Sequence, residues 1–149
     1  MTQIKIKLEF ERGGILYGFL NPEKAPKTVE EVVKVLPISI EAVQSRWCGR
    51  GISWGIKTNS LPPKENSTGI VSKFDITYWR PWDQNEKTPE SKSFESLAFY
   101  YGAEKPSYHD GALSLSVIGR ISYEQEELME EIGERIWLQG SERVRCSLA

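Results

Sequence analysis

Hydrophobic and polar residues alternate along several short stretches of the chain, as they do in half-buried β-strands. The clearest stretch is Ile4–Phe10, where even-numbered residues are apolar and odd-numbered residues are lysine or glutamate. A glycine-containing turn over 11–14 then predicts a β-hairpin with the next stretch. The pattern predicts about eight strands, at 4–10, 15–20, 38–46, 51–56, 76–79, 97–101, 112–121 and 143–148.

The segment 112–121 has a mixed pattern. We expect Leu113, Leu115 and Val117 to share one strand face. The opposite face then carries Ser114, Ser116 and Ile118 and is largely polar.

A different spacing, that of an amphipathic helix, occurs after the second predicted strand. Its apolar positions are Val29, Val32, Val33 and Leu36. Thr28 and Glu31 have the spacing of a capping box, and Pro37 cannot continue a helix. We therefore expect a helix over 28–36 that begins with Thr28 as its N-cap.

A second amphipathic helix is predicted over 125–136, before the last strand. Its apolar face comprises Leu128, Met129, Ile132 and Ile136, and glutamates cover the rest as a solvated face. Many short strands with two helices indicate a single, mainly β domain over 1–149, either a sandwich or a closed barrel. The helices would cap its open ends.

Composition removes several classes of function. The 149 residues suit one domain, and the formal net charge of -2 disfavours nucleic acid as a partner. Neither a long apolar run nor a leader peptide is apparent, so we expect a cytoplasmic protein without a membrane partner. Two cysteines and one histidine cannot complete a Cys/His zinc site, and no phosphate-binding glycine motif occurs. We expect neither a metal nor a cofactor.

Several segments resemble the cyclophilins. Residues 25–32, A-P-K-T-V-E-E-V, are similar to the V-P-K-T-x-E-N-F that opens that family's first helix, and 117–121, V-I-G-R-I, resembles its V-F-G-K-V. The segments D-x-x-Y-W-x-P at 75–81 and Y-Y-G at 100–102 resemble uncharacterised bacterial and archaeal cyclophilin-like domains. The resemblance spans nearly the whole chain. It implies a cyclophilin-like closed eight-stranded β-barrel capped by two α-helices.

Cyclophilins are peptidyl-prolyl isomerases, which lower the high barrier to rotation about the X-Pro amide bond. Their signature F-H-R-x-I-P-G-F-M-x-Q-G-G overlies residues 44–55, and Arg46 takes the position of the catalytic arginine. Gly51 stands where the family has its pocket phenylalanine, Trp54 replaces its glutamine, and Leu115 replaces its histidine. The resemblance therefore favours a rebuilt binding groove over a retained isomerase site.

Aromatic residues supply most of the candidate site. We expect Arg46 to bind the ligand, or to act catalytically, beside Trp47, Trp54, Tyr78, Trp79 and Tyr101. Aromatic side chains offer broad flat surfaces to small molecules and peptides, although several of them are equally suited to fill a barrel core. Trp54 is the preferred pocket residue. The alternative for Arg46 is a surface arginine stacked on Trp47 or Trp79.

Three further chemistries are weaker. His109 and Asp110 are adjacent in a segment typical of an exposed turn, so we expect His109 to be a turn residue and not a catalytic one. No neighbouring sequence feature supports a nucleophilic pair of Cys48 and His109. Ser53 falls in a G-x-S-x-G string but lacks the strand-then-helix context of a nucleophile elbow. Cys146 reads as a core residue. A disulfide between the two cysteines stays open, though an intracellular chain disfavours it.

Three functions follow in order. The first is a module that binds a small molecule or peptide, and the second is a divergent peptidyl-prolyl isomerase that uses Arg46. The third is a partner subunit of an amide-bond hydrolase, by analogy with related barrels in oxoprolinase-type and allophanate-hydrolase-type enzymes. A homo-oligomer also stays open. We expect the variant Arg46→Ala to fold normally.

Overall fold

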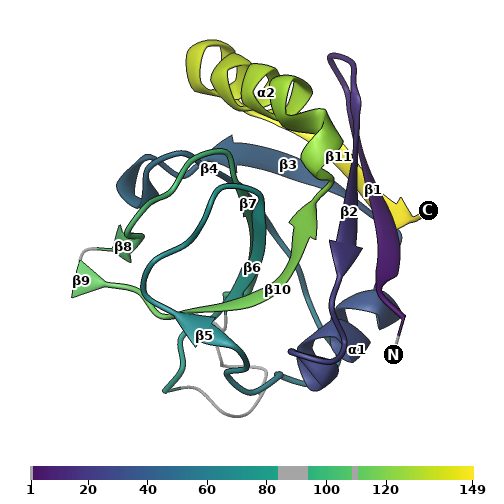
Figure 1. Cartoon of the computed structure of the whole chain (residues 1–149), viewed down its shortest axis with the longest axis vertical. Coiled ribbons are helices and arrows are strands. Elements are labelled where there is room, and N and C mark those ends of the chain that lie inside the picture. The colour runs from purple at the N-terminus through teal and green to yellow at the C-terminus, as the bar shows by residue number, and fades with distance from the viewer. Residues whose placement is uncertain (1, 84–93, 109–110) are drawn as a thin grey trace.

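Eight antiparallel strands close into a barrel, which is one of the two architectures that the alternating pattern allows and the one that the family resemblance implies (Figure 1). The computed structural model describes residues 2–83, 94–108 and 111–149. Around the barrel the order is β2-β1-β11-β3-β4-β7-β6-β10, and pairing of β10 with β2 closes the ring. The strands are β1 (Ile4–Phe10), β2 (Ile15–Leu20), β3 (Ile38–Gln44), β4 (Gly51–Gly55), β6 (Asp75–Trp79), β7 (Ser96–Tyr100), β10 (Leu115–Ile121) and β11 (Glu142–Leu148).

Three two-residue strands lie outside this ring of eight. β5 (Ser67–Thr68) pairs with the edge of β10, and β8 (Ser107–Tyr108) pairs with β9 (Gly111–Ala112) in a small separate ribbon. A single-turn 3-10 helix, η1 (Arg46–Cys48), links β3 to β4, and another, η2 (Tyr123–Gln125), precedes the second α-helix. A two-residue strand is too short to show a hydrophobic period, so the sequence pattern does not distinguish β5, β8 and β9 from loops.

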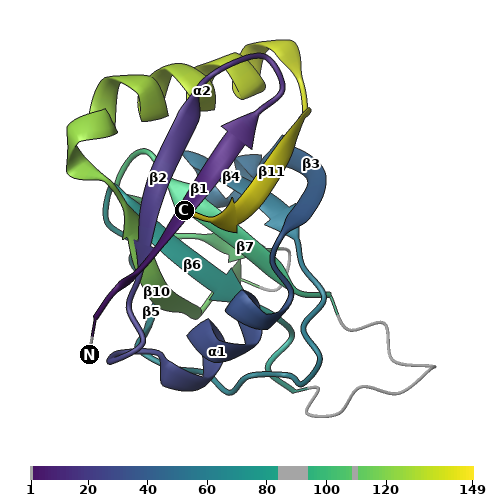
Figure 2. The ribbon, with the colours of Figure 1, turned by 90° about the vertical axis from the view of Figure 1, so that its right-hand side faces the viewer.

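Two amphipathic helices cover opposite ends of the barrel, which confirms the predicted arrangement (Figure 2). α1 (Pro26–Lys34) buries Val29 and Val32, and α2 (Glu126–Gln139) buries Met129, Ile132 and Ile136. None of the described helices is both long enough and apolar enough to span a lipid bilayer.

The start of α1 differs from the expected capping box. The helix begins at Pro26, whose fixed φ and missing N–H suit the first helical position, and Thr28 is buried in its first turn. Glu65, from the loop before β5, takes the role of the cap. Its Oε1 accepts hydrogen bonds from the Thr28 amide at 2.7 Å and the Thr28 hydroxyl at 2.8 Å. Glu31 instead accepts from the Ser60 amide and Lys34.

The strand β10 also departs from the simple alternation expected over 112–121. It begins only at Leu115, and its pairing with β6 shifts between Val117 and Gly119, which marks a β-bulge. Leu115 and Ser116 are both buried, as are Ile118 at the bulge and Ile121 beyond it. The face expected to be largely polar is therefore a buried face at Ser116 and Ile118, and the bulge exchanges the two faces of the strand only after these residues.

The barrel interior holds the apolar half of each alternating strand. Cys146 lies in this core on β11, as expected, where burial raises the pKa of its thiol to about 12. Cys48 is also buried, and both cysteines are free thiols.

A buried carboxylate ties α2 to the β1–β2 hairpin. Glu142 is 2 % exposed at the start of β11, and both of its oxygens bind the Arg135 guanidinium, at 2.9 and 3.0 Å. The same carboxylate accepts from the Arg12 amide at 3.0 Å and from the Arg12 guanidinium at 3.4 Å. Two cations and an amide therefore satisfy a charge that is costly to bury alone.

Candidate functional site: a cavity on the outer face of the barrel

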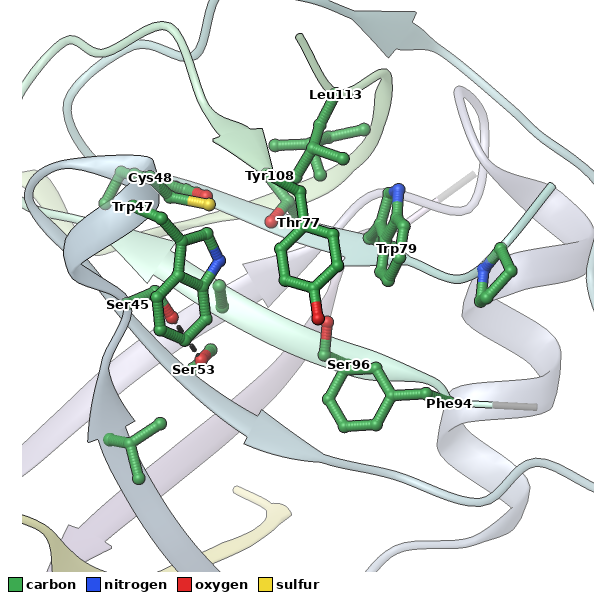
Figure 3. Close-up of a pocket in the computed structure, with 15 residues that line it drawn as sticks. Ser45, Trp47, Cys48, Ser53, Thr77, Trp79, Phe94, Ser96, Tyr108 and Leu113 are labelled. Atoms are coloured by element: carbon green, nitrogen blue, oxygen red, sulfur yellow. Dashed lines mark hydrogen bonds between the residues drawn. The ribbon is translucent and has the colours of Figure 1, made fainter. Parts of the chain in front are cut away.

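The outer face of the barrel is hollowed where three small residues lie side by side on neighbouring strands. Ala98 on β7 is in register with Ser53 on β4 and with Thr77 on β6. Successive residues of a strand point to opposite faces, so the large neighbours of these residues fill the interior instead. The small row forms the floor of a cavity of about 480 Å³ (Figure 3).

Aromatic rings form the rim of this cavity. Trp47 from η1, Tyr108 from β8, Trp79 from β6 and Phe94 ahead of β7 follow one another around it. Their ring centroids lie 6.2 Å (Trp47–Tyr108), 6.3 Å (Tyr108–Trp79) and 6.4 Å (Trp79–Phe94) apart, within the range of interacting aromatic pairs. Three of the four rings are about half exposed, which leaves apolar surface open to a ligand.

The polar groups inside the cavity are hydroxyls. The Ser45 and Ser53 hydroxyls bond to one another at 2.5 Å. Thr77, only 2 % exposed, makes no side-chain hydrogen bond with any described residue, and the same is true of Ser96. Among the described residues that line the cavity, none carries a charge. The site therefore favours an apolar ligand with a few hydrogen-bonding atoms.

Cys48 and Tyr100 form one wall of the cavity, and both stay protonated near neutral pH. Burial raises the pKa of each group, and the Cys48 thiol donates to the Ser107 carbonyl at 3.5 Å. A thiol with a raised pKa is a poor nucleophile. Among the described residues, the Ser53 hydroxyl bonds only to Ser45, and no base lines that part of the cavity. This arrangement suits binding better than nucleophilic catalysis.

Of the six residues that the sequence nominates for the site, two line this cavity. These are Trp47 and Trp79. Trp54, the preferred candidate, is instead 2 % exposed in the barrel core, with its ring 6.3 Å from that of Phe99. Tyr78 is fully buried on the same inner side, and its hydroxyl donates to Glu95 at 2.7 Å. Both side chains sit inside the barrel because they alternate with the small outward residues of β4 and β6.

The remaining two nominated residues, Arg46 and Tyr101, lie in a different and shallower groove beside α2. This groove, of about 370 Å³, also contains Gln44, Glu134 and Trp137. The Arg46 guanidinium stacks over the Trp137 ring at 4.3 Å rather than over Trp47 or Trp79. Tyr101 packs its ring against Gly133 of α2 and accepts a hydrogen bond from Gln44 at 2.9 Å. The expected single site is therefore divided among three places.

The floor residues Thr77, Ser96 and Ala98 did not feature in the sequence interpretation. A usable signal exists on β7, where Ser96 and Ala98 alternate with Leu97 and Phe99. A small residue at every second position of a buried strand leaves room on that face. His109 and Asp110 lie outside the described residues. Within the described ranges, no three His, Cys, Asp or Glu side chains are grouped so that they could hold a metal ion.

Comparison with known proteins places the chain in a family. Residues 15–148 match the family model described as "Protein of unknown function (DUF3830)". The chain belongs to this family. No curated protein matches the sequence of this DUF3830 member.

Solved structures share the barrel at low sequence identity. A structure described as McbB in complex with tryptophan is 16 % identical, with a TM-score of 0.71 over 96 % of this chain. The DUF3830 chain spans only 44 % of the McbB chain. The solution structure of the hypothetical protein AF2241 from Archaeoglobus fulgidus is 21 % identical with a TM-score of 0.60, and the match covers 99 % of this chain and 96 % of that one. At these identities the comparisons establish the fold.

Proposed function

We propose that this protein binds a small organic molecule in the outer-face cavity bounded by Trp47, Tyr108, Trp79 and Phe94. The observation that carries the proposal is the continuous aromatic rim above a floor of small residues. A volume of about 480 Å³ lies within the usual range of ligand sites, which are largely apolar with a few placed polar groups. Aromatic rings that remain half exposed have little structural reason to converge unless something packs between them.

The similarity to McbB adds support to this proposal. That protein has been described in complex with tryptophan, a small molecule that contains an indole ring and, in addition, two charged groups. We also propose that the barrel is of the cyclophilin type, as the motifs at 25–32 and 117–121 suggest. The cavity would then be a rebuilt cyclophilin groove, with Gly51 in place of the pocket phenylalanine.

Binding ranks ahead of prolyl isomerisation because of the position of Arg46. Its guanidinium stacks on Trp137 in the neighbouring groove, and Arg46 is not among the residues that line the cavity. A catalytic arginine must reach the prolyl nitrogen of a bound peptide to act on it. A peptide that carries an aromatic or proline side chain remains the alternative occupant of the same cavity.

The test is to fill the cavity without disturbing the barrel. Ala98→Leu places a larger side chain on the floor, whereas Trp47→Ala removes part of the rim. Trp137→Ala is the matched control, because Trp137 is 42 % exposed against 54 % for Trp47 and lies outside the cavity. Binding of indole, of other aromatic fragments and of short X-Pro peptides is measured by isothermal titration calorimetry.

We expect the wild type and Trp137→Ala to bind aromatic fragments alike. Ala98→Leu and Trp47→Ala should each weaken this binding at least about tenfold, which corresponds to about 1.4 kcal/mol. Ala98→Leu occupies space that the ligand needs, and Trp47→Ala removes apolar contact area from the rim. If the tightest fragment binds Ala98→Leu as well as it binds the wild type, the cavity is not the site. Acceleration of cis–trans exchange in the peptides would instead favour the isomerase alternative.

A further inference from the structure

We infer that the cavity selects an uncharged aromatic ring system with one hydrogen-bonding group, which the hydroxyls of Thr77 and Ser96 recognise. This inference rests on the proposed function and names the class of ligand for the same site. Phenols, indoles and aromatic amides belong to the class. Aromatic carboxylates and amines do not.

The first support is the electrostatic character of the site. The described lining consists of aromatic, aliphatic, thiol and hydroxyl side chains, without any lysine, arginine, aspartate or glutamate. Burying a charged group without a partner costs several kilocalories per mole, far more than a hydroxyl can return. A ligand that places a carboxylate or an ammonium group near the floor would therefore bind weakly, because the cost of desolvating the charge is not recovered.

The second support is a pair of hydroxyls that face the cavity. Thr77 is 2 % exposed, lines the cavity, and forms no side-chain hydrogen bond with the described residues. Ser96, on the next strand, also forms no side-chain hydrogen bond with a described residue, and it faces the same space (Figure 3). A hydroxyl that the protein does not engage can donate a hydrogen bond to a ligand or accept one from it. A ligand with a hydrogen-bonding group at the floor would therefore find a partner in either residue.

The positions of these hydroxyls also define how a ligand would lie. Thr77 pairs in register with Ala98, and Ser96 pairs with Trp79 two residues further along β6. The two hydroxyls are therefore diagonal neighbours on the floor, close to the Trp79 ring. A planar ring that packs among Trp79, Tyr108 and Trp47 would present one polar edge to them and its faces to the rim.

The experiment compares matched probes on matched variants by isothermal titration calorimetry. Indole and phenol are neutral members of the class, toluene has no hydrogen-bonding group, and indole-3-acetate and tryptamine add one charge of either sign. Thr77→Val removes the hydroxyl and keeps the shape of the side chain, and Ser96→Ala removes the second hydroxyl. Thr68→Val, on β5 outside the cavity, is the control.

We expect indole and phenol to bind at least about tenfold more tightly than the charged probes. Thr77→Val should weaken indole about five- to tenfold, leave toluene unchanged, and change the melting temperature little, because the Thr77 hydroxyl makes no hydrogen bond with the described residues. Equal or tighter binding of a charged probe, or unchanged indole binding in both hydroxyl variants, overturns the inference while the proposed function stands. If none of the five probes binds the wild type, this inference and the proposed aromatic site both fail.

Discussion

The ring of Tyr100 on β7 lies directly over Gly51 on β4. Its Cε2 atom is 2.7 Å from the position that a β-carbon at residue 51 would occupy. The two residues are also partners in the sheet register. Gly51 has no side chain of its own at this point of the strand. The neighbouring strand supplies the aromatic ring instead.

Adding a side chain at Gly51 should therefore be costly. Gly51→Ala places a methyl group in contact with the Tyr100 ring, and overpacking of this kind typically costs about 1–3 kcal/mol. We expect a lower free energy of unfolding by that amount in urea denaturation. In the background Tyr100→Ala the same substitution should cost much less, because the obstructing ring is gone. Equal costs in the two backgrounds would show that the contact does not exclude a β-carbon.

The carboxylate of Glu142 should be a major contributor to stability. Glu142→Gln leaves Arg135 and Arg12 facing a neutral amide in a buried site, so we expect a loss of about 2–4 kcal/mol in the free energy of unfolding. Glu41→Gln is the control, since its pair with Arg143 is exposed on both sides and spans 3.8 Å. It should cost less than about 1 kcal/mol. A similar loss in both variants would contradict this ranking.

The loop residue Glu65, rather than a capping box, should stabilise the start of α1. Glu65→Ala leaves the Thr28 amide and hydroxyl without their acceptor, and loss of a cap costs about 1 kcal/mol. We expect a loss of that size by chemical denaturation. Amide hydrogen exchange should also become faster in the first turn of α1. Unchanged exchange at Thr28 in this variant would show that the helix start does not depend on Glu65.

Cys48 should report on occupancy of the cavity through its reactivity. Burial raises the pKa of its thiol, so at any given pH it holds less thiolate than an exposed cysteine. We expect alkylation by iodoacetamide to be slower at pH 7.5 than that of an exposed cysteine and to accelerate only at a more alkaline pH than an exposed thiol requires. The reaction is followed by mass spectrometry, with Cys48→Ser as the assignment control. A saturating neutral aromatic probe should slow it further. Fast alkylation of Cys48 at pH 7.5 that the probe does not slow would contradict the placement of a buried, protonated Cys48 thiol in the cavity wall.

The sequence predicts most of the barrel strands and both helices because their signals are periodic. Alternation in Ile4–Phe10 and the apolar faces of α1 and α2 survive in the structure. The bulge between Val117 and Gly119 escapes prediction because one inserted residue leaves the local pattern intact. The cap by Glu65 escapes for a different reason. It depends on two segments 37 residues apart meeting in space.

The site is less predictable than the fold, because it depends on which side of a strand faces outward. Trp54 and Ser53 are adjacent in sequence, yet one fills the core and the other lines the cavity. Arg46 and Trp47 are also adjacent, and they point into different depressions. The density of aromatic residues in the sequence points to the rim residues Trp47 and Trp79. It does not reveal that the cavity exists because its floor is made of small residues.

The most direct test of the proposed site follows the five tryptophans during a titration. Each indole N–H gives its own nuclear magnetic resonance signal, and Trp47, Trp54, Trp79, Trp82 and Trp137 are spread over the rim, the core and the α2 groove. With ¹⁵N-labelled protein and indole as probe, we predict saturable shifts of the Trp47 and Trp79 signals while Trp137 stays in place. A shift of Trp137 with Trp47 and Trp79 unmoved would contradict the account and place binding beside Arg46.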